Sequence, residues 1–211
     1  MRAALSAAVT HTIAMPHGAV SGSRRGPFTW DDFVRLGEDD LRELIDGELV
    51  EVEVPTKWHE HVVAMLVTFL NAWAIPRKAG RALASGYKVR IDETRGVMPD
   101  VQFLTAAGFA RAGQEGLDDG RPELAVEVLS PSSRGADRVK KLGWYASIGT
   151  PEYWIVDPQA RTVERLVLSA EGHYTIADGA SDAEVFRPAS FEGLEVPLAE
   201  LWDVPASWRE E

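Results

Sequence analysis

Two apolar runs with a helical segment between them give the clearest hydrophobic pattern in the chain. Residues 124–129 (LAVEVL) and 152–157 (EYWIVD) are almost continuously apolar, which is typical of strands buried on both faces of a sheet. Residues 135–149 between them show helical spacing of apolar positions. A strand, a helix and a strand in this order predict a right-handed βαβ unit over 122–158, with its two parallel strands in the centre of a sheet.

For two helices, the sequence predicts which side is apolar. The helix within 135–149 should stop at Gly149, and a longer helix over 58–78 should end at Pro76. The side chains predicted to face inward are Val139, Leu142 and either Tyr145 or Ala146 in the first helix and Val62, Leu66, Phe69 and Trp73 in the second.

The remaining segments predict antiparallel additions to this unit. Thr29 is a good N-cap for a short helix ending near Gly37, and Asp46-Gly47 is typical of a type I′ turn in a hairpin. Residues 86–92 and 98–105 should be two strands joined at 94–96, and further strands follow residue 162. The predicted fold class is α/β (α+β), a mixed central sheet flanked by helices, with an N-terminal hairpin and C-terminal strands.

The length and composition suit one globular domain. The chain has 211 residues, 45% hydrophobic and 26% charged. We expect a disordered leader over 1–26, one domain over 27–205 and a tail over 206–211. The sequence has no cysteine, which excludes disulfides and thiolate zinc sites and suits the cytoplasm. No apolar run approaches the roughly 18–20 residues that a membrane-spanning helix needs, so no membrane association is expected.

The charge gives no support to nucleic-acid binding, although it leaves room for it. Acids outnumber bases 33 to 22, a formal net charge of −11. Most of the excess lies after residue 170, where ten acids face two bases, while the first 170 residues are close to balanced. A local contact with a phosphate backbone is therefore compatible with the composition.

Two acids point to a metal site. Glu127 lies among apolar neighbours, where an unpaired ionised carboxylate would cost several kcal/mol, and Asp100 opens a strand. If the two strands are neighbours, the carboxylates converge, and a divalent cation would relieve their repulsion. Mg²⁺ or Mn²⁺ held by Asp100 and Glu127 is therefore one interpretation. The alternative is a structural ion pair between Glu127 and Arg121, Lys88 or Arg90.

The motifs also carry a family resemblance. Pro99-Asp100 resembles the PD-(D/E)XK nuclease pattern, but Leu129 stands where that pattern has a lysine. The chain more closely resembles the Uma-type family of bacterial restriction endonucleases, from about Phe28 to Trp202. The shared motifs are ELIDGELVE, PDV, EVLSPSS, a D-x-x-x-K-x-x-x-Y helix and GTPEYWIVDP.

The resemblance implies a restriction endonuclease-like fold, metal-dependent DNA cleavage and further site residues. In that family the basic residue is thought to come from the helix, where Lys141 matches, and Glu43 matches an acid of the ELIDG segment. The alternatives for Lys141 are a solvated charge on the helix face or an i, i+4 pair with Asp137. The alternative for Glu43 is a hairpin-edge acid paired with Arg42 or a lysine. His61 matches a histidine near the site, whereas the spacing of the HEH segment (59–61) does not suit zinc.

Three functions follow from these features. The first is a Mg²⁺-dependent endonuclease that hydrolyses DNA phosphodiesters with metal-activated water, using Asp100, Glu127, Lys141 and Glu43. DNA would then approach a rim formed by Lys88, Arg90, Arg134 and Arg138. The second is a non-catalytic structural or interaction module on the same fold, and the third is a metal-dependent hydrolase of a small phosphate compound. The resemblance and the apolar C-terminal strands also favour a homodimer.

Overall fold

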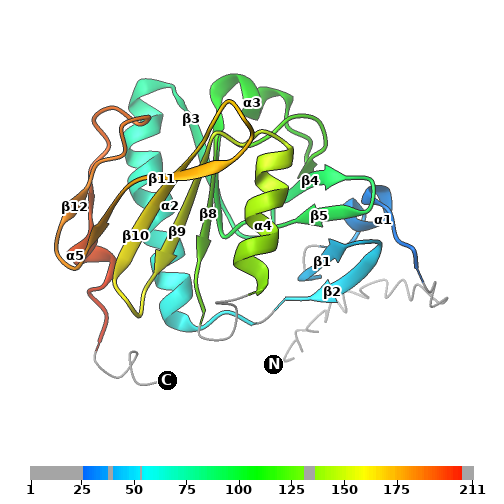
Figure 1. Ribbon diagram of the computed structural model, residues 1–211, viewed down its shortest axis with the longest axis horizontal. Coiled ribbons are helices and arrows are strands. Elements are labelled where there is room, and N and C mark those ends of the chain that lie inside the picture. Colours follow the sequence, from blue (N-terminus) through cyan, green and yellow to red (C-terminus); the bar gives the residue numbers. More distant parts are fainter. Residues whose placement is uncertain (1–25, 38–39, 53, 131–135, 206–211) are drawn as a thin grey trace, which may run out of the picture.

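The computed structural model describes residues 26–37, 40–52, 54–130 and 136–205, and Figure 1 shows their arrangement. The predicted leader, except Gly26, and the predicted tail lie outside the described residues. The helices are α1 (Trp30–Val34), α2 (Lys57–Arg77), α3 (Ala106–Arg111), α4 (Ala136–Ser147) and α5 (Leu198–Leu201). The strands are β1 (Arg42–Ile45), β2 (Glu48–Glu51), β3 (Gly80–Ala84), β4 (Lys88–Asp92), β5 (Arg95–Val97), β6 (Val101–Thr105), β7 (Gly116–Leu117), β8 (Leu124–Val128), β9 (Glu152–Asp157), β10 (Thr162–Leu168), β11 (Tyr174–Ser181), β12 (Val185–Phe186) and β13 (Val196–Pro197).

The central sheet has six strands in the order β11-β10-β9-β8-β6-β3. Strands β8 and β9 are parallel and joined through α4, which confirms the predicted βαβ unit and its central position. The pairs β6–β8, β3–β6, β9–β10 and β10–β11 are antiparallel, so the sheet is mixed as predicted.

Successive residues of β8 point to opposite faces of this sheet, and each face has its own core. Val126 and Val128 pack with the buried side of α2 and with the C-terminal segment. Ala125 packs on the other face, with Tyr145 of α4 and Val89 of β4. Figure 1 shows the two helices on either side of the sheet. Glu127 shares the face of Ala125, and its side chain therefore lies on the α4 side.

The predicted hairpin belongs to a second sheet, of order β2-β1-β5-β4-β7. Asp46 and Gly47 both have positive φ, as a type I′ turn requires. The expectation that residues 94–96 simply join two strands is wrong. Residues 95–97 form β5, which pairs with β4 and β1, while β6 enters the central sheet. Gly96 allows this packing, because a Cβ there would lie 2.6 Å from Phe33 Cδ1.

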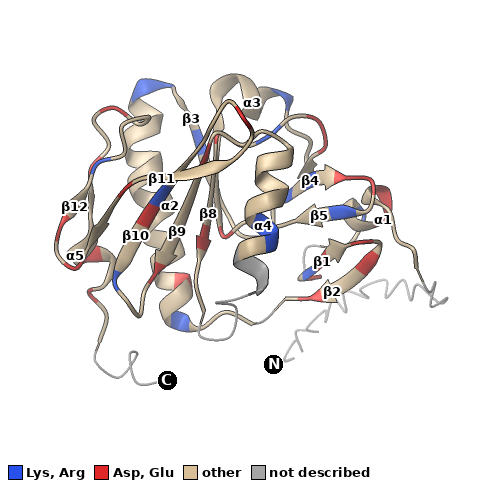
Figure 2. Cartoon of the chain, in the orientation of Figure 1, with Lys and Arg blue, Asp and Glu red and all other residues tan. Residues whose placement is uncertain are grey.

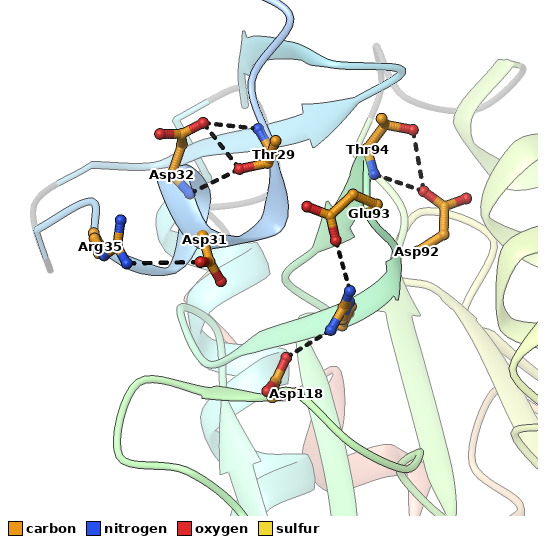
Figure 3. A network of polar contacts seen from close by, with 9 residues as sticks. Thr29, Asp31, Asp32, Arg35, Asp92, Glu93, Thr94 and Asp118 are labelled. Atoms are coloured by element: carbon orange, nitrogen blue, oxygen red, sulfur yellow. Dashed lines mark hydrogen bonds and ion pairs between the residues drawn. The ribbon is translucent and has the colours of Figure 1, made fainter.

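The helices follow local signals with three exceptions. Thr29 forms a capping box with Asp32, drawn in Figure 3, but α1 ends at Val34, before Gly37. Pro76 lies inside the last turn of α2, and the helix ends in the left-handed Lys78. Val139 was predicted to face inward and is instead 75% exposed, so this part of the α4 prediction is wrong. Among the described residues, no helix combines the length and apolar character needed to cross a membrane.

Candidate active site

Asp100 lies immediately before β6, and β6 pairs with β8, so the predicted condition for convergence with Glu127 is met. The register places Val101 opposite Val126, which brings Asp100 to the C-terminal end of β8. Its Oδ2 accepts a hydrogen bond of 2.7 Å from the backbone N–H of Val128, the residue after Glu127. The backbone of β8 therefore fixes the first acid beside the second.

Glu127 is held by two side chains of α4. Lys141 Nζ lies 3.2 Å from its Oε2, and the Tyr145 hydroxyl donates to its Oε1 at 3.0 Å. Lys141 and Tyr145 are four residues apart, so both project from one side of the helix toward β8. Figure 2 shows the acidic position of β8 and the basic positions of α4 near the same end of these elements.

The alternative partners proposed for Glu127 are wrong. Lys88 is buried and donates to the carbonyl oxygens of Val34 and Leu36. Arg90 pairs with Glu93 and Asp118, which Figure 3 shows converging on one guanidinium group. The third alternative, Arg121, lies just before the opposite end of β8.

Glu43 joins the cluster from the second sheet. It is only 5% exposed, and its Oε1 accepts from the Met98 N–H at 2.9 Å and lies 3.2 Å from Lys141 Nζ. Of the alternative partners expected for Glu43, Arg42 is wrong, since it forms its ion pair with Asp40, whereas a lysine partner is confirmed in Lys141. One ammonium therefore bridges an acid of β1 and an acid of β8, and so ties the two sheets together.

The close packing of this cluster shifts the pKa of Glu127, Lys141 and Tyr145. Burial raises the pKa of Glu127 to about 8, because Lys141 offsets only part of that effect while Asp100 and Glu43 add to it. Burial alone would lower the pKa of Lys141, but Glu127, Glu43 and Asp100 hold it well above its ordinary value. Burial and the charge of Glu127 raise the pKa of Tyr145, which keeps its hydroxyl a donor. Lys141 thus stays cationic in an environment with excess negative charge.

His59 is the site residue that the motif comparison missed. Its Nε2 lies 3.3 Å from Asp100 Oδ2, and its side chain is only 11% exposed. Burial lowers the pKa of His59, but the hydrogen bond and charge of Asp100, together with Glu60, raise it above the ordinary value. The helical spacing contained the signal, because His59 lies three residues before Val62, on the buried side of α2.

The structure tests only part of two other predictions, the DNA-facing rim and the pair between Lys141 and Asp137. Lys88 cannot contribute to a DNA-facing rim, because it is buried, and Arg90 is held by two acids. Arg134 and the side chains of Arg138 and Asp137 lie outside the described part of the chain.

The donor set suits a hard cation. Asp100 keeps its Oδ1 clear of hydrogen bonds from the described residues, and carboxylate oxygens are the ligands that Mg²⁺ prefers. The three acids also outnumber the single lysine between them. In the described ranges, no group of three or more His, Asp or Glu side chains is arranged to hold a metal ion. Asp100 and Glu127 remain the two carboxylates expected to bind a cation, and this metal site stays a prediction.

These features define an α/β protein of the restriction endonuclease-like class, with the predicted mixed sheet, N-terminal hairpin and C-terminal strands. The chain belongs to the Uma2 family, described as "Putative restriction endonuclease", whose model matches residues 30–199.

A crystal structure described as "a putative nuclease belonging to DUF820" from Anabaena variabilis ATCC 29413 has the same fold. It matches with a TM-score of 0.68 at 20% identity, and the match covers 87% of this chain and 99% of that chain. No curated protein matches the chain.

Proposed function

We propose that the chain is a Mg²⁺- or Mn²⁺-dependent endonuclease that hydrolyses DNA phosphodiester bonds. The observation that carries the proposal is the meeting of Asp100, Glu127 and Glu43 around the ammonium of Lys141. Membership of the Uma2 family supports it. Two acids for a cation and a buried lysine beside them are the groups that phosphodiester hydrolysis needs.

Each residue has a separate role in this proposal. Asp100 and Glu127 would hold the cation, with the Val128 carbonyl as a further ligand, and Glu43 would support them through Lys141. A bound Mg²⁺ or Mn²⁺ would make a coordinated water more nucleophilic and stabilise charge on a phosphoryl oxygen. Lys141, which stays protonated, would orient the attacking water and stabilise the pentacovalent phosphate.

The reaction needs no covalent enzyme intermediate. The water oxygen forms a bond to phosphorus, and the bond from phosphorus to one ester oxygen breaks. The water gives up one proton to solvent, and the departing ester oxygen takes up one as an alcohol. The products are a phosphate monoester end and a hydroxyl end.

DNA binding should be weak and sensitive to salt. Lys88 is buried and Arg90 is paired with acids, so only Arg134 and Arg138 of the predicted rim are left to bind DNA. Few phosphates of the DNA would then be neutralised. The predicted homodimer and the cytoplasmic location stay part of this proposal.

The test incubates the purified chain with supercoiled plasmid and Mg²⁺ or Mn²⁺ at low salt, beside Asp100→Asn. Nicking by the wild type and not by the variant is the expected result. Equal nicking by both would mean a contaminating nuclease, and nicking by neither, at a metal concentration that saturates the wild type, would contradict an endonuclease.

A second function is favoured by the net charge of −11, which suits a small phosphate compound better than DNA. The same acids would then hydrolyse a small phosphodiester. Bis(p-nitrophenyl) phosphate is a suitable probe, because its hydrolysis without plasmid nicking would support this function. A chain that binds the metal and cleaves neither substrate would instead be the non-catalytic module.

A further inference from the structure

A hollow lies at the other end of β8 from the acid cluster. Its volume is about 520 Å³, and β4, α3, the segment between β7 and β8, and the residue after α4 form its walls. Glu123, at its edge, precedes Glu127 by four residues, a separation of about 13 Å at the usual rise of a strand. A ligand in this hollow would therefore not meet the acids of the candidate active site.

Three arginines and two acids, Asp118 and Glu123, line this hollow, and the arginines differ in their surroundings. Arg90 is already neutralised, because Glu93 and Asp118 bind its guanidinium at 2.7 and 3.1 Å. Arg111 and Arg121 also line the hollow and are exposed. As far as the structure describes the chain, neither forms an ion pair or a side-chain hydrogen bond. In a protein with 33 acids and 22 bases, two such arginines around one hollow are unexpected.

Arg121 is supported in position by the end of α4. A Cβ built on Gly149 would lie 3.4 Å from Arg121 Nε and 3.6 Å from its Cδ, so the arginine side chain lies along this glycine. Gly149 has a φ of +74°, which a side chain would disfavour. The helix end thus leaves room for the arginine beside the hollow.

The other side chains that line the hollow restrict the kind of ligand that it can bind. Ile91 and Ile148 provide an apolar wall, and Glu123 is a hydrogen-bond acceptor. Within the described ranges, the Glu123 side chain has no hydrogen bond or ion pair. Guanidinium groups bind phosphate oxygens with two parallel hydrogen bonds, and hollows of roughly 300–1,000 Å³ accept small ligands.

We propose that Arg111 and Arg121 bind the phosphate of a small phosphate monoester of mononucleotide size, whose hydroxyl or amino donors face Glu123. This binding site is separate from the proposed nuclease function and does not depend on it.

Isothermal titration calorimetry of the full chain at low salt, with adenosine 5′-monophosphate and with inorganic phosphate as probes, tests this. Arg111→Gln with Arg121→Gln should weaken binding of both probes about tenfold or more. Arg35→Gln with Arg187→Gln removes the same charge at exposed positions elsewhere and should change little. Glu123→Gln should weaken binding of the nucleotide and not that of inorganic phosphate.

The outcomes are decisive because both arginines are exposed and the variants are expected to fold. An unchanged melting temperature of the Arg111 and Arg121 variant checks this. Equal weakening in both double variants, or no saturable binding of either probe by the wild type, would overturn the proposal. Loss of DNA binding in the Arg111 and Arg121 variant, with no nucleotide binding by the wild type, would instead assign these arginines to a nucleic-acid contact.

Discussion

The imidazole of His59 lies against Asp100, with Nε2 3.3 Å from Oδ2, and reaches it from the first turn of α2. Asp100 also accepts the Val128 N–H through the same oxygen. Two contacts on Oδ2 orient the carboxylate and leave its Oδ1 directed elsewhere, as second partners of metal ligands commonly do. His59 is therefore a positioning residue in the proposed cation site.

His59→Ala should weaken Mg²⁺ or Mn²⁺ binding about 10–100-fold, because Asp100 loses one of the two contacts that orient it. Calorimetric titration of the metal gives this value directly. His61→Ala is the matched control and should leave metal binding unchanged. A loss in the His61 variant with none in the His59 variant would return the role to the histidine that the motif comparison selected.

Local signals were sufficient for the elements that are complete within a short segment. Asp46-Gly47 determined the hairpin, and the two apolar runs with their helix determined the central βαβ unit. Strand β3 was not predicted, because its sequence GRALA has little strand character of its own and its pairing with β6 depends on the tertiary fold. The division into two sheets also escaped prediction, since it depends on the packing of Phe33 over Gly96.

Some residues of the candidate site could be predicted from the sequence alone, and others could not. The cost of burying Glu127 and the strand position of Asp100 pointed to these acids directly. Lys141 and Glu43 were reached only through the family resemblance, because helix and hairpin spacing alone do not show that they meet. The hydrogen bonds of Lys88 could not be predicted from the sequence, since its acceptors are backbone carbonyls of residues more than fifty positions away.

Mn²⁺ or Mg²⁺ at millimolar concentration should raise the melting temperature, because a ligand that binds only the folded state stabilises it. Asp100→Asn combined with Glu127→Gln should abolish the rise, which differential scanning calorimetry measures. Glu48→Gln with Glu51→Gln, on the exposed strand β2, removes the same charge and should retain it. A rise that survives in the Asp100 and Glu127 variant would place the metal elsewhere.

The charge of Glu127 should make stability depend on pH when no metal is present. Its folded pKa of about 8 exceeds the ordinary 4.5, so the folded state holds this proton more tightly than the unfolded state does. The resulting stabilisation is complete below about pH 4.5 and is lost as the pH rises through about 8. The melting temperature of Glu127→Gln should therefore fall less than that of the wild type between pH 6 and 9.

Metal binding should show the opposite trend, because the cation requires the ionised carboxylate. Affinity for Mg²⁺ should increase as the pH rises through about 8. Glu48→Gln, which alters an exposed carboxylate of β2, should keep the wild-type dependence on pH in both measurements. Identical pH profiles for the wild type and Glu127→Gln would show that Glu127 titrates in its ordinary range.

Lys141→Ala should lower the free energy of unfolding by about 3–5 kcal/mol above about pH 8, since it leaves the ionised Glu43 and Glu127 buried without their cation. Lys140→Ala changes an exposed residue and should stay within about 0.5 kcal/mol of the wild type. Urea denaturation followed by circular dichroism measures both values.

Adding Glu127→Gln to Lys141→Ala separates the structural contribution of the lysine from its proposed catalytic one. Above about pH 8, where Glu127 is ionised, the double variant removes one of the two uncompensated charges and should recover part of the lost stability. Its cleavage of phosphodiesters should stay lost, because the donor that orients the water is still missing and one proposed ligand has gone as well. Where Lys141→Ala folds, its rate should fall about 10²–10³-fold while that of Lys140→Ala stays near the wild-type rate. An active Lys141→Ala beside an inactive Lys140→Ala would move the chemistry to the opposite side of α4.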